Sequence, residues 1–123
     1  MNREILFRGK RIDNGDWVYD YFERMNGYSY IVNENMRRVR EAVIPETVGQ
    51  YTGFTDKNGV KIFEGDILKF LSGNYVVEWH HDHGKFLQVD RQFSREIFIC
   101  INESEIIGNI YDNPELLEMN ADK

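Results

Sequence analysis

The stretch from Thr47 to Lys69 limits the fold more than any other, because it carries three local signals in close succession. It contains a short segment with strand character, the dipeptide Asn58-Gly59, and the dipeptide Gly65-Asp66 at the entry to a second apolar segment. Asn-Gly favours a tight turn, since both residues tolerate a positive φ angle. This spacing predicts short antiparallel strands rather than helices.

The same pattern of short apolar segments separated by glycine-containing turns recurs in the rest of the chain. Asn14-Gly15 and Asn26-Gly27 each separate runs rich in aromatic and β-branched residues, which predicts a three-stranded meander with type I′ turns. Ser72-Gly73-Asn74 marks a further turn, and Asn113-Pro114 predicts the start of a short C-terminal helix. We therefore expect a mainly β fold, either a small barrel or packed antiparallel sheets, with an SH3-like C-terminal half and a short C-terminal helix.

The length predicts one domain over residues 1–123, since a chain of 123 residues buries enough surface to fold without disulfides or metals. Two lobes within that domain are the alternative division. Residues 1–46 would form the β meander, and residues 47–123 would form the SH3-like half.

The segment Met36–Ile44 is ambiguous. Its Arg, Glu and Ala content and the spacing of Val39, Val43 and Ile44 fit a helix, but Val39 and Ile44 also fit the ends of a strand. Pro45 ends the segment in either case, because the residue before a proline avoids the helical region.

Cysteine usage and hydropathy indicate the compartment. Cys100 is the single cysteine, so the chain cannot form an internal disulfide, and its apolar neighbours favour a buried, inert thiol over a nucleophile. The N-terminus opens no apolar signal region and the apolar runs are far too short to span a membrane. The sequence predicts a cytoplasmic protein with no membrane partner.

The formal net charge of −6 and the pI of about 5.0 argue against tight nucleic-acid binding, which depends on Lys and Arg neutralising phosphates. A local patch is the alternative, formed by three arginines close in sequence to Tyr28 and Tyr30. The candidate contacts of that patch are Arg37, Arg38 and Arg40. A solvated segment, with Glu34 and Glu41 offsetting the arginines, explains the same pattern more simply.

Two clusters could carry chemistry. His81 and His83 would point the same way on a strand and could ligate a metal, although Asp82 and Gly84 also suit a polar hairpin tip. Glu64 and Asp66 would share a strand face as an acid–base pair, which Asp56 could join. Carboxylates that face solvent or accept hydrogen bonds from turn amides are the simpler interpretation.

The chain resembles the YopX-like family of temperate-phage and prophage proteins, and the similar motifs extend over nearly its whole length. They are Phe7-Arg8-Gly9-Lys10, Trp17-Val18-Tyr19, Thr47–Gly53, Asp56–Gly59, Ile62–Ile67, Ile107–Tyr111 and Asn113–Leu117. Asp20 departs from the family pattern, which has Gly there. The resemblance implies a predominantly β fold and a phage or prophage origin, and it implies no activity.

The function expected from these observations is a non-enzymatic accessory protein without a cofactor. It would bind a phage or host protein, or a second copy of itself, through an exposed aromatic surface. A nucleic-acid-associated barrel using Arg37–Arg40 and a metal-dependent enzyme at His81 and His83 are the alternatives. The candidate interaction or structural motif consists of Tyr51, Thr52, Gly53, Asp56, Asn58, Gly59, Glu64, Gly65 and Asp66.

Overall fold

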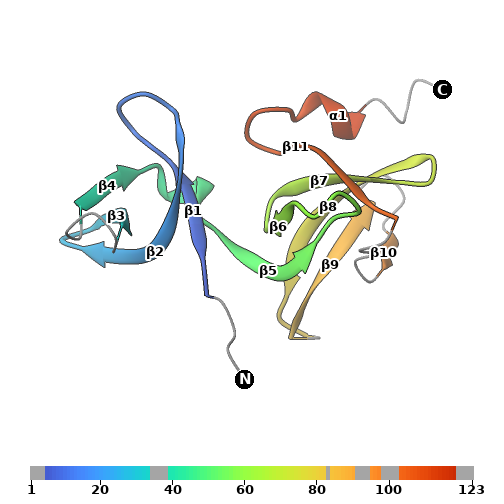
Figure 1. The fold of residues 1–123 in the computed structure, drawn as a ribbon, viewed down its shortest axis with the longest axis horizontal. Coiled ribbons are helices and arrows are strands. Elements are labelled where there is room, and N and C mark those ends of the chain that lie inside the picture. The colour runs from blue at the N-terminus through green and yellow to red at the C-terminus, as the bar shows by residue number, and fades with distance from the viewer. Residues whose placement is uncertain (1–4, 34–38, 83, 91–94, 98–102, 119–123) are drawn as a thin grey trace. The chain divides into compact units, whose positions relative to one another are not determined.

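The computed structural model describes residues 5–33, 39–82, 84–90, 95–97 and 103–118, and these residues fall into two compact units. Unit 1 covers Met1–Tyr51 and unit 2 covers Thr52–Lys123. The fold is mainly β with one short helix, as the sequence predicts (Figure 1). The strands are β1 (Phe7–Lys10), β2 (Trp17–Met25), β3 (Tyr28–Asn33), β4 (Val39–Val43), β5 (Gly49–Thr55), β6 (Lys61–Phe63), β7 (Asp66–Phe70), β8 (Gly73–His80), β9 (Lys85–Asp90), β10 (Arg95–Ile97) and β11 (Glu105–Asn109).

Unit 1 is an antiparallel sheet with the strand order β4-β3-β2-β1-β5. A short 3-10 turn, η2 (Pro45–Thr47), leads from β4 to β5. Beyond β1 the chain turns along the outer edge of β4, where the Ile12 N–H donates to the Ala42 carbonyl at 3.0 Å. The Ile44 N–H donates to the Lys10 carbonyl at 2.8 Å. These bonds bring the first and fourth strands together, so the sheet of unit 1 is strongly curled.

The ambiguous segment is a strand where it is described. β4 pairs with β3 from Asn33↔Val39 to Ser29↔Val43, while residues 36–38 lie outside the described residues. Val43 is fully buried, and a Cβ added to Gly9 would lie 3.0 Å from the Val43 Cβ. The valine therefore occupies the space that a side chain at position 9 would need. The pairing of every residue of β4 with β3 excludes the helical alternative for Val39–Val43.

Two of the Asn-Gly turns differ from the type I′ prediction. Asn26-Gly27 confirms it, since both residues have positive φ angles, 55° and 83°, in a two-residue loop. In the β1–β2 connection and in the β5–β6 turn only the glycines, Gly15 and Gly59, have positive φ. The β1–β2 connection is also longer than a two-residue turn and extends from Arg11 to Asp16. It is longer because Arg11 forms a β-bridge with Val43 of β4.

Unit 2 contains an open antiparallel sheet with the order β10-β9-β8-β7-β11, and β6 lies next to the end of β5. The described strands therefore form sheets rather than a closed barrel, and the SH3-like likeness stays a prediction. The turn between β7 and β8 is Leu71-Ser72, not Ser72-Gly73-Asn74, because Phe70 pairs directly with Gly73. Leu71 takes the positive φ angle of this turn, 57°.

Two apolar clusters form the core of unit 2. One consists of Ile62, Leu68 and Val77, with Phe86 and Ile106 against it. The other consists of Val76, Leu87 and Val89, with Ile110 and Leu117 against it. Leu117 belongs to α1 (Glu115–Glu118), so the short C-terminal helix that Asn113-Pro114 predicts packs on the second cluster. Among the described residues, no helix has the length and apolar character needed to cross a lipid bilayer.

Candidate functional site

Asp56 is buried and joins two distant segments of unit 2. Its Oδ1 accepts the backbone N–H groups of Asn58 at 2.9 Å and Val60 at 3.0 Å. Its Oδ2 accepts the N–H of Ile106 in β11 at 3.0 Å. Next to it, the Lys57 N–H donates to the Ser104 carbonyl at 2.9 Å. Asp56 therefore holds its own turn and fastens that turn to β11.

The pKa of Asp56 is lowered from the ordinary aspartate value. Burial acts in the opposite direction and raises it, but the hydrogen bonds from the N–H groups of Ile106, Val60 and Asn58 outweigh burial. The charge of Lys57 lowers it slightly further. These donors stabilise the ionised carboxylate, which makes Asp56 a hydrogen-bond acceptor of the fold and a poor proton donor at neutral pH.

Glu64 and Asp66 do not share a strand face, which corrects the geometry expected for an acid–base pair. Glu64 lies with Gly65 in the tight turn between β6 and β7, where Gly65 has a φ of 93°, and Asp66 is the first residue of β7. Asp66 is buried, and its Oδ2 accepts the Phe63 N–H at 2.7 Å. Its carboxylate thus closes the turn that precedes it.

The other residues of the central motif also lie in structural positions. The hydroxyl of buried Thr52 donates to the Ile62 carbonyl at 2.8 Å and accepts the Phe54 N–H at 3.1 Å. Gly53 takes a φ of 91°, and the N–H of half-buried Tyr51 donates to the Leu6 carbonyl at 2.8 Å. The stretch that dominates the sequence is therefore built around backbone hydrogen bonds.

The candidate metal ligands and nucleophile lie only partly within the described residues. His81 is exposed in the turn after β8, whereas His83 and Cys100 lie outside the described residues. In the described ranges, no group of three or more His, Cys, Asp or Glu side chains is arranged to hold a metal ion.

The arginine patch is represented by Arg40 in β4, because Arg37 and Arg38 lie outside the described residues. The Arg40 Nε is 2.7 Å from Glu23 Oε1, and the hydrogen bond to this carboxylate is the main reason why the pKa of Arg40 is raised. A phosphate that approached Arg40 would have to compete with Glu23.

Four large side chains stand exposed on one face of the β2–β3 hairpin. In strands, alternate residues share a face, and Met25 lies directly opposite Tyr28. We call these residues the aromatic face, and their exposed fractions are well above those of a core: Tyr19 48%, Tyr21 50%, Met25 39% and Tyr28 59%. Trp17 precedes them on the same side and is only half-buried, with the Arg8 guanidinium 4.6 Å from its ring centroid.

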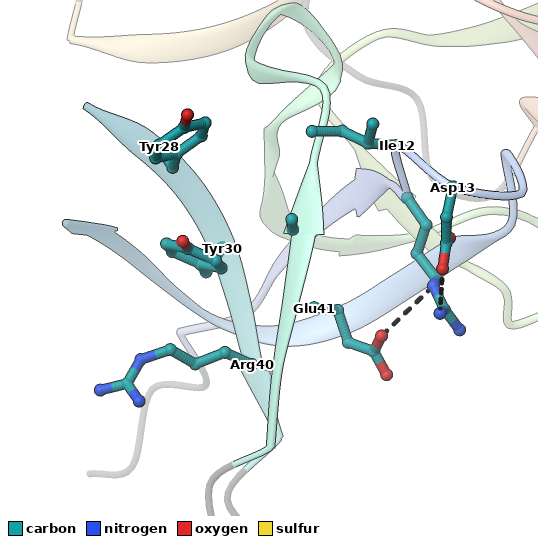
Figure 2. Close-up of a pocket in the computed structure, with 8 residues that line it drawn as sticks. Ile12, Asp13, Tyr28, Tyr30, Arg40 and Glu41 are labelled. Atoms are coloured by element: carbon teal, nitrogen blue, oxygen red, sulfur yellow. Dashed lines mark hydrogen bonds and ion pairs between the residues drawn. The ribbon is translucent and has the colours of Figure 1, made fainter. Parts of the chain in front are cut away.

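A pocket of about 390 Å³ lies next to the aromatic face, and we call it the tyrosine pocket. Tyr28 and Tyr30 of β3, Arg40 and Ala42 of β4, and Ile12 of the β1–β2 connection line it, together with Arg11, Asp13 and Glu41. Figure 2 shows both tyrosines on the same side of the sheet as Arg40, whereas Glu41 leaves the other side of β4. The structure thus brings Tyr28, Tyr30 and Arg40 of the predicted patch together.

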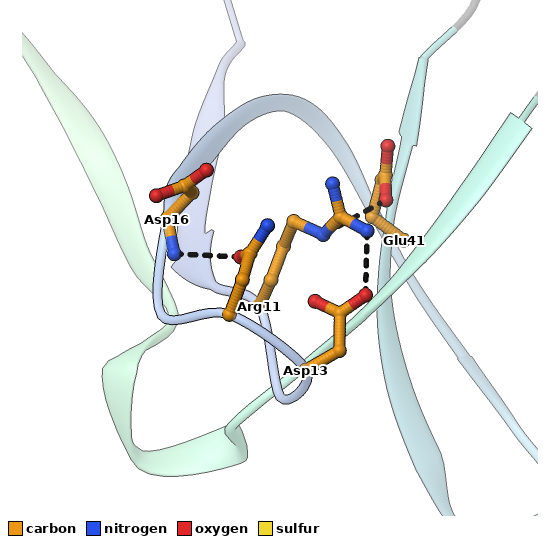
Figure 3. A network of polar contacts seen from close by, with 5 residues as sticks. Arg11, Asp13, Asp16 and Glu41 are labelled. Carbon is orange, nitrogen blue, oxygen red and sulfur yellow. Dashed lines mark hydrogen bonds and ion pairs between the residues drawn. The ribbon is translucent and has the colours of Figure 1, made fainter.

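Arg11 is the centre of a polar network at the rim of this pocket. Its NH2 group is 2.6 Å from Asp13 Oδ2 and its Nε is 3.2 Å from Glu41 Oε2 (Figure 3). The hydrogen bond to Asp13 is the main cause of a raised pKa for Arg11. Asn14 Oδ1 accepts the Asp16 N–H at 2.9 Å and stiffens the same loop. Both arginines that line the pocket are therefore paired with carboxylates.

The charge of the protein is divided unequally between the units. Residues 1–51 contain eight Lys or Arg and eight Asp or Glu, whereas residues 52–123 contain seven and thirteen. The formal charge of −6 therefore belongs entirely to unit 2, and the unit that carries the aromatic face and the tyrosine pocket is neutral.

Sequence reasoning missed four residues of the pocket: Arg11, Ile12, Asp13 and Ala42. Arg11, Ile12 and Ala42 meet because the chain beyond β1 pairs with β4. A signal for this arrangement was present in the sequence. Val39, Glu41 and Val43 alternate with Arg40 and Ala42, and this alternation fits a strand with two unlike faces.

Comparisons with known proteins identify the family of the chain. No curated protein matches the chain. The model of the YopX protein family matches residues 2–118, which is almost the entire sequence and includes every described strand and the C-terminal helix. The chain therefore belongs to the YopX protein family.

Proposed function

We propose that this YopX family member is a non-enzymatic accessory protein of a phage or prophage that binds another protein through the aromatic face. The observation that carries the proposal is the exposure of Tyr19, Tyr21, Met25 and Tyr28 on one side of a two-stranded hairpin. Tyrosine and methionine are enriched in protein interfaces, and tyrosine supplies a large contact area at a small entropic cost.

The geometry of the buried carboxylates supports the non-enzymatic part of the proposal. Asp56 and Asp66 accept backbone N–H groups, so these carboxylates are engaged in turns rather than directed at a substrate. A general acid must be able to donate a proton to a bound substrate, and a general base must be able to accept one from it, each within hydrogen-bond reach. These bonds favour a structural role for both residues.

The experiment compares the wild type with a Tyr19→Thr, Tyr21→Thr double variant. Threonine suits a strand and removes the rings, and both positions are about half exposed, so the melting temperature should change little. Each tagged protein is incubated with lysates of bacteria that carry or lack the phage, and retained proteins are quantified by mass spectrometry. We expect the wild type to retain one protein in stoichiometric amount and the double variant to lose it.

A Phe54→Thr, Val60→Thr variant is the matched control, because both side chains are exposed and lie in unit 2. It should retain the partner as the wild type does. The proposal fails if the wild type retains no stoichiometric protein, or if the Tyr19→Thr, Tyr21→Thr variant retains the same protein at the same level.

A further inference from the structure

The tyrosine pocket has a charge pattern that limits what it can bind. Arg11 is held by Asp13 and Glu41, and Arg40 is held by Glu23, at 2.6 to 3.2 Å. The cations and anions at its wall thus compensate one another. The lining therefore has no net formal charge, with Arg11 and Arg40 against Asp13 and Glu41, and a charged ligand would gain little electrostatic attraction from it.

The surfaces that remain for binding are apolar. Tyr28 and Tyr30 supply two rings from one strand, and Ile12 stands across from them as a wall. Ala42 lies directly opposite Tyr30 in the β3–β4 register, and its small side chain leaves the floor of the pocket open. A volume of about 390 Å³ is near the lower limit of ligand pockets, which suits one large side chain better than an extended ligand.

We infer that the tyrosine pocket receives one large uncharged aromatic side chain of the protein partner, an inference that rests on the proposed function. Interfaces draw most of their affinity from a few anchor side chains that fill pockets, and aromatic rings pack favourably on tyrosine. The aromatic face would contact the partner around this anchor, since Tyr28 belongs to both surfaces.

A nucleic-acid occupant fits these observations less well. Stacking of bases on Tyr28 and Tyr30 would require nearby cations to neutralise the phosphates. Arg11 and Arg40 already face carboxylates, and unit 1 as a whole has as many acidic as basic residues. The charge balance therefore favours a neutral protein side chain.

The experiment measures binding of small probes to the full chain by NMR, using backbone amide shifts. The probes are N-acetyl-tryptophanamide, N-acetyl-argininamide, N-acetyl-glutamic acid amide and a single-stranded oligothymidine. We expect the tryptophan probe to shift the amides of Ile12, Tyr30 and Ala42 saturably, with a dissociation constant in the millimolar range for a ligand of this size. The two charged amino-acid probes and the oligonucleotide should not shift these amides at the same concentration.

Two variants test the location. Ala42→Phe fills the floor of the pocket and should weaken binding of the tryptophan probe at least about tenfold, because overpacking leaves no room for the ring. Ile12→Ala removes the wall and should weaken binding even if Ala42→Phe disturbs the strand. Val60→Phe, at an exposed position in unit 2, should bind as the wild type does.

The inference is overturned if the tryptophan probe fails to bind up to its solubility limit, or if its binding survives both pocket variants. It is also overturned if the arginine probe, the glutamic acid probe or the oligonucleotide binds there more tightly, or if the amides shift with protein concentration alone, which would indicate a second copy as the occupant. Partner capture by Ala42→Phe separates the two proposals. If the partner is retained by Ala42→Phe but lost by Tyr19→Thr, Tyr21→Thr, the pocket inference alone fails.

Discussion

Asp56 and Ile106 are 50 residues apart in the sequence, and a carboxylate oxygen of Asp56 accepts the backbone N–H of Ile106 at 3.0 Å. The other oxygen accepts the N–H groups of Asn58 and Val60. A single side chain therefore satisfies three backbone donors and links the β5–β6 turn to β11. Such a link makes the stability of the protein depend on the ionisation of one buried group.

The first prediction concerns acid. The pKa of Asp56 is lowered in the folded state, so its contribution to stability is fully present above the ordinary aspartate pKa of 3.8 and is lost as the pH falls through the lower, folded-state value. Urea unfolding measured over a pH series should therefore show a smaller loss of stability below about pH 4 in Asp56→Asn than in the wild type. At neutral pH the variant should be less stable by about 1–3 kcal/mol, because its amide nitrogen faces backbone donors.

Identical pH profiles for Asp56→Asn and the wild type would contradict this assignment. Glu105→Gln serves as the control, since Glu105 is a half-buried carboxylate in the neighbouring strand, 3.5 Å from the Lys57 ammonium. The Glu105→Gln substitution should change the dependence of unfolding free energy on pH less than the Asp56→Asn substitution does.

The second prediction concerns Gly59. Its φ of 82° lies in the left-handed region, and a Cβ there would meet no atom within 4 Å, so a substitution costs backbone strain and no steric clash. Gly59→Val should lower the free energy of unfolding by about 1–3 kcal/mol, since β-branched residues are strongly disfavoured at positive φ. Gly59→Asn should lose less, because Asn tolerates this region. A Gly59→Val protein that melts like the wild type would refute the turn assignment.

The third prediction concerns Asp66, whose Oδ2 accepts the Phe63 N–H at 2.7 Å. Asp66→Asn keeps an oxygen that can accept this bond, so its melting temperature should stay close to that of the wild type. Asp66→Ala leaves the Phe63 N–H without this acceptor and should lower the free energy of unfolding by about 1–3 kcal/mol. If partner binding is lost in Asp66→Asn while the melting temperature is normal, the carboxylate has a binding role instead.

The fourth prediction concerns nucleic acid. Fluorescence anisotropy with single- and double-stranded DNA should show weak binding that disappears with modest added salt, because few phosphate contacts would carry it. Arg40→Gln should change this binding little, since the Arg40 Nε already pairs with the Glu23 carboxylate at 2.7 Å. Submicromolar, sequence-selective binding near physiological salt would place the nucleic-acid alternative above the protein-binding one.

The fifth prediction concerns metal. Elemental analysis of the purified, untagged protein should find no stoichiometric zinc, nickel or iron, since His81 is exposed and a tetrahedral site needs several converging ligands. The contrary result would be a stoichiometric metal that is lost in a His81→Ala, His83→Ala double variant. That finding would revive the metal-dependent enzyme as the leading hypothesis.

Local turn chemistry was readable from the sequence, and the mainly β fold followed from it. Asn26-Gly27 forms the expected turn because both residues tolerate positive φ. The β7–β8 turn was misplaced by one residue, because Gly73 and Asn74 looked like turn residues. Asn74 instead lies in β8, where its side-chain amide donates to the Leu116 carbonyl at 2.8 Å, and exposed Leu71 takes the strained angle.

The candidate site was harder to predict, because it depends on contacts between distant segments. The sequence grouped Tyr28, Tyr30 and Arg40 by proximity, and the β3–β4 pairing does bring them together. No local pattern indicated that Ile12 would lie against β4, or that Glu23 would pair with Arg40. Register and long-range ion pairs arise from the assembled sheet, so they cannot be derived from any one window of residues.

The contact between Gly9 and Val43 has a consequence for how YopX proteins can diverge. The two positions share one volume, since a Cβ at position 9 would lie 3.0 to 3.1 Å from the Val43 side chain. A larger residue at position 9 requires the Val43 side chain either to shift by a few tenths of an ångström or to be replaced by a smaller one, because the two side chains would otherwise be overpacked. Across relatives that keep this curled sheet, substitutions at the two positions should therefore often occur in pairs, with the loss of atoms at one site matched by a gain at the other.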